Sequence, residues 1–421
     1  DDAAARRGTS RWRLVALLSL ATLALTLGLG ASWLARRGAV PSPSIGGRTI
    51  VTQLTNYDGS ETSAAIAPDG RSFAFVSKHG GTADIWLRQV SGGEPVRLTN
   101  DEAEESELVF APSGEYIYFT RTDGNDTSIW QVGALGGQTR KVLANAQSPS
   151  PSRDGRQLAW FRAEPGAGFA FMLSISGVDG TDPRVLVRNV RAVLTPSRPA
   201  WSRDDRQLAF TSGGLFESRN LSVVNVADGR TRQVTHFGQS AVGTQSQEWL
   251  PDNRHLIVSY LASPRALGTD DIGVVDVETG VITRLTENVA EGFGSPTISA
   301  DGNRMTVTST RTLREVWRVP FGPDPTANGR GAVRLLDASL DPMWTYVTRD
   351  GRTLLFNNAV VGSRNLWSMS LDGTGTPRQV TSVSGDAVTH SSLSPDGSRV
   401  AFSSSATGSA DIWVQNVDGS E

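Results

Sequence analysis

Eight residues of this chain carry side chains suited to binding and lie in segments that we expect to be surface loops. They combine carboxylates, guanidinium groups and one indole: Glu61, Glu105, Glu107, Arg191, Arg198, Glu248, Glu291 and Trp344. Charged groups select oppositely charged partners and an indole supplies an apolar anchor, so such a face could dock a peptide or a protein. The plainer interpretation of any one of them is an ordinary solvated loop residue.

The residue types and spacings of common catalytic sites are missing from the sequence. There is no cysteine, and the four histidines lie far apart, at positions 79, 236, 255 and 390. Disulfides, cysteine-ligated metals and a cysteine nucleophile are therefore excluded, and no usual metal-ligand spacing is present. The Gly-x-Ser-x-Gly element of serine hydrolases is also absent, because Gly238-Gln239-Ser240 continues with Ala-Val. We expect no catalytic activity and no cofactor in this segment.

A turn signal recurs along most of the chain. Its last positions fall at 70, 114, 155, 205, 253, 302, 351 and 397, a mean spacing of about 47 residues, which is typical of propeller blades. In the fullest copies proline fixes φ, aspartate bonds its own backbone and glycine takes a left-handed conformation. The eight copies are Ala67-Pro68-Asp69-Gly70, Ala111-Pro112-Ser113-Gly114, Ser152-Arg153-Asp154-Gly155, Ser202-Arg203-Asp204-Asp205, Leu250-Pro251-Asp252-Asn253, Ser299-Ala300-Asp301-Gly302, Thr348-Arg349-Asp350-Gly351 and Ser394-Pro395-Asp396-Gly397.

Each turn is followed by the same downstream pattern. A short apolar strand comes first, then a strand that opens on Asp-Ile-Trp or a similar triplet, then a glycine turn and a final strand that ends on Leu-Thr or Val-Thr. The triplet tryptophans are best explained as packing between blades, rather than as an aromatic ligand cage. Four short strands that are apolar on both faces cannot be buried alone, so the units must stack and close into a ring. The sequence predicts an all-β fold, a β-propeller of four-stranded blades, about eight in number with seven possible.

These repeats resemble the TolB-like β-propeller repeat family over residues 49–421. The resemblance implies a binding propeller rather than an enzyme. Residues 51–55 (Val-Thr-Gln-Leu-Thr) match the last strand of a blade but precede the first full repeat, whereas the eighth repeat stops before its own last strand. We therefore expect residues 51–55 to complete the eighth blade and close the ring.

The first 48 residues have a different composition. Residues 1–13 form a basic juxtamembrane segment, residues 14–35 an almost unbroken apolar run and residues 36–48 a linker with two prolines. An apolar helix of this length spans roughly 30 Å at about 1.5 Å per residue, so residues 14–35 are predicted to be a transmembrane helix. A cleaved signal peptide is the alternative, although the run is longer than a usual signal core.

These features together predict an extracytoplasmic binding or sensing propeller, tethered by a single pass to a bacterial inner membrane. It would be the sensor part of a larger signalling protein, as in bacterial Ser/Thr kinases or winged-helix regulators whose C-terminal regions have this organisation. Its partner would be a protein or peptide of the cell envelope. The formal net charge of -3 gives no sign of nucleic-acid binding. The alternatives are a soluble TolB-like envelope scaffold and the propeller gating domain of a truncated peptidase.

Overall fold

The computed structural model describes residues 51–57, 59–79, 81–192, 194–214, 217–238, 243–261, 270–286, 292–310, 314–337, 342–358, 365–382, 388–404 and 411–418. By backbone contacts the chain divides at residue 52, and nearly all of the described residues belong to the second unit, Gln53–Glu421. The predicted segments 1–13, 14–35 and 36–48 lie outside the described residues. Within the described part of the chain, no helix has the length and apolarity needed to cross a membrane.

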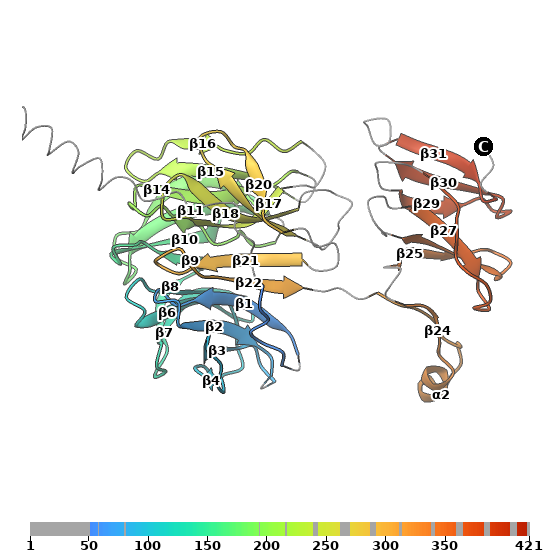
Figure 1. The fold of residues 1–421 in the computed structure, drawn as a ribbon, viewed down its shortest axis with the longest axis horizontal. Coiled ribbons are helices and arrows are strands. Elements are labelled where there is room, and N and C mark those ends of the chain that lie inside the picture. Colours follow the sequence, from blue (N-terminus) through green and yellow to red (C-terminus); the bar gives the residue numbers. More distant parts are fainter. Residues whose placement is uncertain are drawn as a thin grey trace, which may run out of the picture. The chain divides into compact units, whose positions relative to one another are not determined.

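The described residues form antiparallel sheets with almost no helix (Figure 1). In the first five sheets the strand order follows the chain order, as expected for the blades of a propeller. These sheets are β1 (Glu61–Ile66), β2 (Ser72–Ser77), β3 (Asp84–Gln89) and β4 (Val96–Arg97); β5 (Glu104–Phe110), β6 (Tyr116–Asp123), β7 (Asp126–Gly133) and β8 (Arg140–Ala144); β9 (Gln147–Pro151), β10 (Gln157–Ala163), β11 (Ala170–Gly177) and β12 (Arg184–Arg191); β13 (Ala200–Trp201), β14 (Gln207–Ser212), β15 (Asn220–Asn225) and β16 (Thr231–Gln233); and β17 (Gly243–Trp249), β18 (His255–Leu261), β19 (Asp271–Asp276) and β20 (Ile282–Arg284).

The last three repeats also give sheets, and the sixth repeat is split in two. Its first half is β21 (Gly292–Ile298) with β22 (Met305–Thr310), and its second half is β23 (Val316–Arg318) with β24 (Val333–Leu336), joined through α2 (Pro325–Arg330). The seventh sheet is β25 (Pro342–Val347), β26 (Thr353–Asn358), β27 (Asn365–Ser370) and β28 (Arg378–Gln379). The eighth is β29 (Thr389–Leu393), β30 (Arg399–Ser404) and β31 (Asp411–Asn416). Each of the eight predicted repeats therefore forms sheet structure.

The predicted turns between the first two strands of each sheet are confirmed. Gly70 has φ of 69°, its amide donates to the carbonyl of Ala67 at 2.9 Å, and Asp69 accepts from the amide of Arg71 at 2.9 Å. Where the sequence lacks the glycine, Asp205 and Asn253 take the same left-handed conformation, with φ of 57° and 55°. Aspartate and asparagine tolerate this region better than most residues, which explains why these repeats keep the turn.

The first six repeats are linked in a cycle of contacts. The first strand of each sheet contacts that of the next, and β1 contacts both β21 and β22. Figure 1 shows β1 beside β21 and β22. At this junction the amide of Ile66 donates to the hydroxyl of Thr297 at 3.0 Å, and the amide of Ala300 donates to the carbonyl of Pro68 at 2.9 Å. The cycle thus holds six sheets rather than the eight, or possibly seven, that the sequence predicts. The repeat pattern predicts how many sheets form. Because all repeats share it, the pattern does not show which sheet packs against the first and closes the cycle.

The expectation that residues 51–55 form the last strand of the eighth blade is wrong. They form no strand. The guanidinium of Arg88, in the first sheet, donates instead to the carbonyl of Leu54. The second half of the sixth repeat also departs from the simple pattern, since Leu336 of β24 packs with Leu354 and Phe356 of the seventh sheet.

Candidate functional site

A repeated β-bulge shapes the first strand of most sheets. In β1, β5, β9, β21 and β25 one non-glycine residue takes a positive φ beside a shift in register: Ser63, Glu107, Ser148, Ser295 and Trp344, with φ between 39° and 57°. A bulge re-aims the side chain and bends the strand. Ser63, Glu107 and Ser295 consequently line one cavity together, although they come from three different sheets.

Two charged cavities lie between the first strands of the six-sheet cycle. The one that we call the glutamate cavity has a volume of about 250 Å³ and is lined by Glu107, Arg198 and Asp270 among others. The one that we call the arginine cavity has a volume of about 310 Å³ and is lined by Arg153, Arg198, Arg203 and Glu248 with apolar neighbours. Arg198 belongs to both linings, so the cavities adjoin at this side chain.

Glu248 is the buried centre of the arginine cavity. Its side chain is 5% exposed. One carboxylate oxygen forms an ion pair with the guanidinium of Arg198 at 2.7 Å, and the other forms an ion pair with that of Arg153. Burial alone would raise the pKa of Glu248, but the positive charges of Arg153 and Arg198 outweigh it and lower the pKa. The carboxylate is therefore ionised at neutral pH and tied to two partners.

Arg153 and Arg203 enter the same cavity from two equivalent turns. Both occupy the turn position at which the first, second, fifth and eighth repeats have proline. The amide of Arg153 donates to the carboxylate of Asp205 at 2.7 Å, which ties the third turn to the fourth. Burial, followed by the charge of Arg153, lowers the pKa of Arg203 to about 10, so this guanidinium stays charged at neutral pH.

The glutamate cavity has the opposite character. Glu107 is partly buried, and its carboxylate accepts from the hydroxyl of Ser148 at 2.7 Å. Burial raises its pKa. Burial also raises the pKa of Asp270 to about 6, against the opposing charge of Arg219. The two adjoining cavities therefore differ in charge, one rich in arginine and the other in carboxyl groups that hold their protons more tightly than usual.

The structure brings together three of the predicted site residues at these cavities, Glu107, Arg198 and Glu248. Arg191 lines a neighbouring cavity of about 220 Å³ that Glu107 also borders. The loop assignment was wrong for Glu107 in β5 and Glu248 in β17, whereas Arg198 does lie outside the strands. Charged residues are usually predicted to be solvent-exposed, and therefore in loops. Here they lie in the first strands of the sheets, which line cavities.

The other predicted residues lie elsewhere or outside the described chain. Glu105 is also in β5, not in a loop, and accepts from the amide of Ile85 at 3.2 Å. Glu61 is the first residue of β1, where its carboxylate accepts from the hydroxyl of Thr55 at 2.6 Å. Trp344 occupies the bulge of β25, again in a strand. Glu291 lies outside the described residues.

Arg153 and Arg203 were missed by the sequence analysis. Their signal was present, since arginine replaces the turn proline in two adjacent repeats. The signal is not specific, because the seventh repeat also has arginine at this position and Arg349 is exposed.

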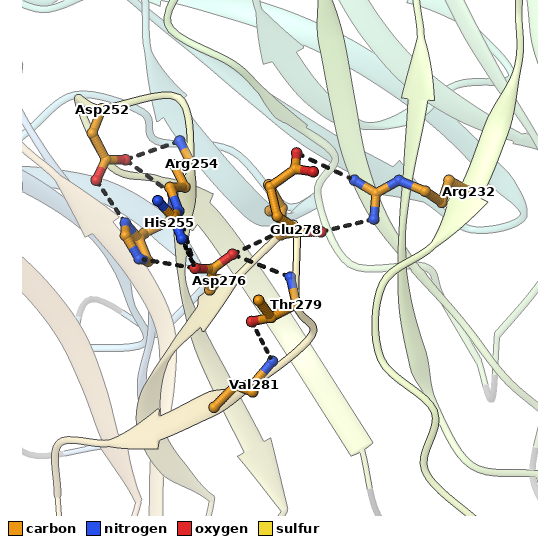
Figure 2. A network of polar contacts seen from close by, with 9 residues as sticks. Arg232, Asp252, Arg254, His255, Asp276, Glu278, Thr279 and Val281 are labelled. Carbon is orange, nitrogen blue, oxygen red and sulfur yellow. Dashed lines mark hydrogen bonds and ion pairs between the residues drawn. The ribbon is translucent and has the colours of Figure 1, made fainter.

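A second polar network, in the fifth sheet, has a structural explanation (Figure 2). His255 Nδ1 lies 2.7 Å from a carboxylate oxygen of Asp252, and the other ring nitrogen lies 3.7 Å from Asp276. Asp276 also accepts from Arg254 at 2.7 Å. The network ties the turn after β17 to the turn after β19, and Arg232 extends it to the fourth sheet by donating to the carbonyl of Val277 at 2.7 Å. No group of three potential metal-ligating side chains occurs among the residues described.

Comparison with known proteins gives a fold likeness. No family model and no curated protein matches the chain. Among solved structures, a TolB protein from Agrobacterium tumefaciens is 14% identical, with 60% of this chain and 91% of that chain covered and a TM-score of 0.49. TolB from Acinetobacter baumannii is 12% identical, with 76% and 63% covered and a TM-score of 0.43. An oligogalacturonate lyase in complex with manganese is 14% identical, with 86% and 92% covered and a TM-score of 0.41.

The antiparallel four-stranded sheets are consistent with a β-propeller. Among propellers, the chain resembles TolB and related proteins. At these identities and scores the likeness concerns the fold and says nothing about the two cavities.

Proposed function

We propose that this chain is an extracytoplasmic propeller that binds a protein or peptide of the cell envelope and acts as the sensor part of a larger signalling protein. Residues 14–35 would tether it to the bacterial inner membrane. The observation that carries the proposal is the pair of charged cavities between the first strands of the six-sheet cycle. Concave sites with apolar walls and a few placed polar groups are typical of ligand binding.

The chemistry of the arginine cavity favours binding over catalysis. A general acid or base works best with a pKa near the operating pH. Glu248 does not meet this condition, because its pKa is lowered and both carboxylate oxygens are paired with arginines. Its role is to hold Arg153 and Arg198 in place, which suits recognition. We infer that the segment has no catalytic activity of its own.

The absence of cysteine allows a direct test of topology. A single cysteine introduced as Leu135→Cys, at a side chain that is 99% exposed, should react with a membrane-impermeant maleimide in cells whose outer membrane has been permeabilised. The matched variant Ser10→Cys, before the apolar run, should react only after lysis, and both proteins should resist extraction of the membranes with alkaline carbonate. A protein that is released by carbonate would contradict tethering and favour the soluble scaffold.

Binding is tested separately by photo-crosslinking in cells. A benzophenone amino acid at Ser197, which lines the glutamate cavity, should give a discrete adduct of higher mass. The same group at Leu135 should not, because that side chain is exposed and is not among the residues that line either cavity. Equal labelling at both positions would contradict a cavity-based binding site.

A further inference from the structure

The arginine cavity holds more positive than negative charge. Arg153, Arg198 and Arg203 line it, against the single carboxylate of Glu248. Glu248 is shared between Arg153 and Arg198. Among the described residues, the guanidinium of Arg203 donates only a long hydrogen bond, 3.4 Å, to the carbonyl of Ser299. Within the described part of the chain, the buried Nε atoms of Arg153 and Arg203 have no hydrogen-bond partner. Buried charged donors are costly unless they are paired, so this cavity is suited to an anion.

We propose that the arginine cavity binds the free C-terminal carboxylate of a peptide whose last residue is apolar. This rests on the proposed function of the chain as a peptide-binding propeller. The planar fork of an arginine matches the two oxygens of a carboxylate, and such charge-assisted pairs are the stronger hydrogen bonds in proteins.

The walls of the cavity indicate the rest of the ligand. Ile66, Val109, Phe110 and Ile298 lie among its lining residues, beside three prolines. A bare phosphate would satisfy the arginines but make little contact with these apolar groups, whereas an apolar terminal side chain would pack against them. The volume of about 310 Å³ is at the lower end of the range for ligand sites, which fits a chain end and not a folded domain.

The two turns and the side chain of Arg153 are held in place before any ligand arrives. Asp205 accepts from the amides of Arg153, at 2.7 Å, and of Asp154, at 2.9 Å, so the third and fourth turns are joined. Glu248 fixes the guanidinium of Arg153. A site supported in this way loses little conformational entropy on binding.

The test is calorimetric titration of the whole 421-residue chain in a mild detergent. The probe is the peptide acetyl-Ala-Ala-Leu with a free carboxylate, compared with its C-terminal amide. The acid should bind, and the amide should bind at least about tenfold more weakly, because a charged hydrogen bond would be lost. Arg203→Gln should weaken binding of the acid by about 10- to 100-fold for the same reason.

Arg349→Gln is the matched control. Arg349 occupies the equivalent turn position in the seventh repeat, is exposed and is not among the residues that line the cavity. Its affinity for the acid should stay within a factor of two of the parent chain, roughly the precision of such titrations. If Arg203→Gln does not fold, Arg203→Lys keeps the charge without the fork and should bind more weakly than the parent.

Several results would overturn the proposal. These are equal binding of the acid and the amide, equal losses from Arg203→Gln and Arg349→Gln, undiminished binding by Arg203→Lys, no peptide binding at millimolar concentration, or binding of inorganic phosphate without binding of the peptide. Failure here is distinguishable from failure of the proposed function, since the adduct at Ser197 and the membrane topology do not depend on a terminal carboxylate.

Discussion

Replacing Glu248 by glutamine should destabilise the ring strongly. The glutamine has nearly the same shape but no charge, so Arg153 and Arg198 would remain partly buried, 28% and 14% exposed, beside Arg203 without a compensating carboxylate. Removing one partner of a buried ion pair typically costs about 3–5 kcal/mol. Because Arg153 retains some contact with water, we expect a loss near the lower end, about 3 kcal/mol in the free energy of unfolding.

The assay is urea unfolding followed by tryptophan fluorescence, together with amide exchange of β17, where Glu248 lies. The control is Glu278→Gln, because Glu278 is 72% exposed and 3.9 Å from Arg232. That change should alter stability by less than about 0.5 kcal/mol. A loss below about 1 kcal/mol for Glu248→Gln would refute the conclusion that its ion pairs are desolvated.

Three further changes test other parts of the account. Burial raises the pKa of Glu105 from 4.5 to about 7, so between these pH values the native state binds a proton that the unfolded state has lost. The free energy of unfolding should therefore fall as pH rises from about 4.5 to about 7. Glu105→Gln should reduce that fall in urea unfolding measured across this pH range, and an unchanged pH profile would contradict the raised pKa. Thr381→Val removes a hydroxyl that accepts from the amide of Leu366 at 2.9 Å, which should cost about 1–3 kcal/mol in chemical unfolding, with Thr381→Ser costing less. Trp249→Phe removes the indole N–H that donates to the carbonyl of Ala200 at 3.0 Å, so it should lower the midpoint of thermal unfolding measured by circular dichroism. An unchanged midpoint would contradict a stabilising role for this hydrogen bond between the fourth and fifth sheets.

Local features of the fold were predictable from the sequence because the repeat specifies them directly. The turn at Gly70 and the apolar strand after it lie where the pattern placed them. The closure was not predictable. The contact of Ile66 with Thr297 joins residues more than 200 positions apart, and the repeat pattern does not specify which two sheets meet.

The site was predictable only in part. Glu107, Arg198 and Glu248 were singled out for their charge, and they do line the cavities. The difference between Glu105 and Glu107 was hidden, because the bulge between Ser106 and Val109 breaks the alternation of side chains along β5. A one-residue irregularity of this kind leaves no mark in composition or spacing.

The measurement that tests the six-sheet closure most directly uses pairs of introduced cysteines. The carbonyl of Pro68, on the first turn, accepts from the amide of Ala300, on the sixth, at 2.9 Å. Pro68→Cys combined with Ala300→Cys should therefore crosslink efficiently with a short bismaleimide in the otherwise cysteine-free chain. Pro68→Cys combined with Pro395→Cys, on the eighth turn, should not. Crosslinking of the second pair instead of the first would mean that the eighth sheet closes on the first, and would contradict the arrangement that forms both cavities.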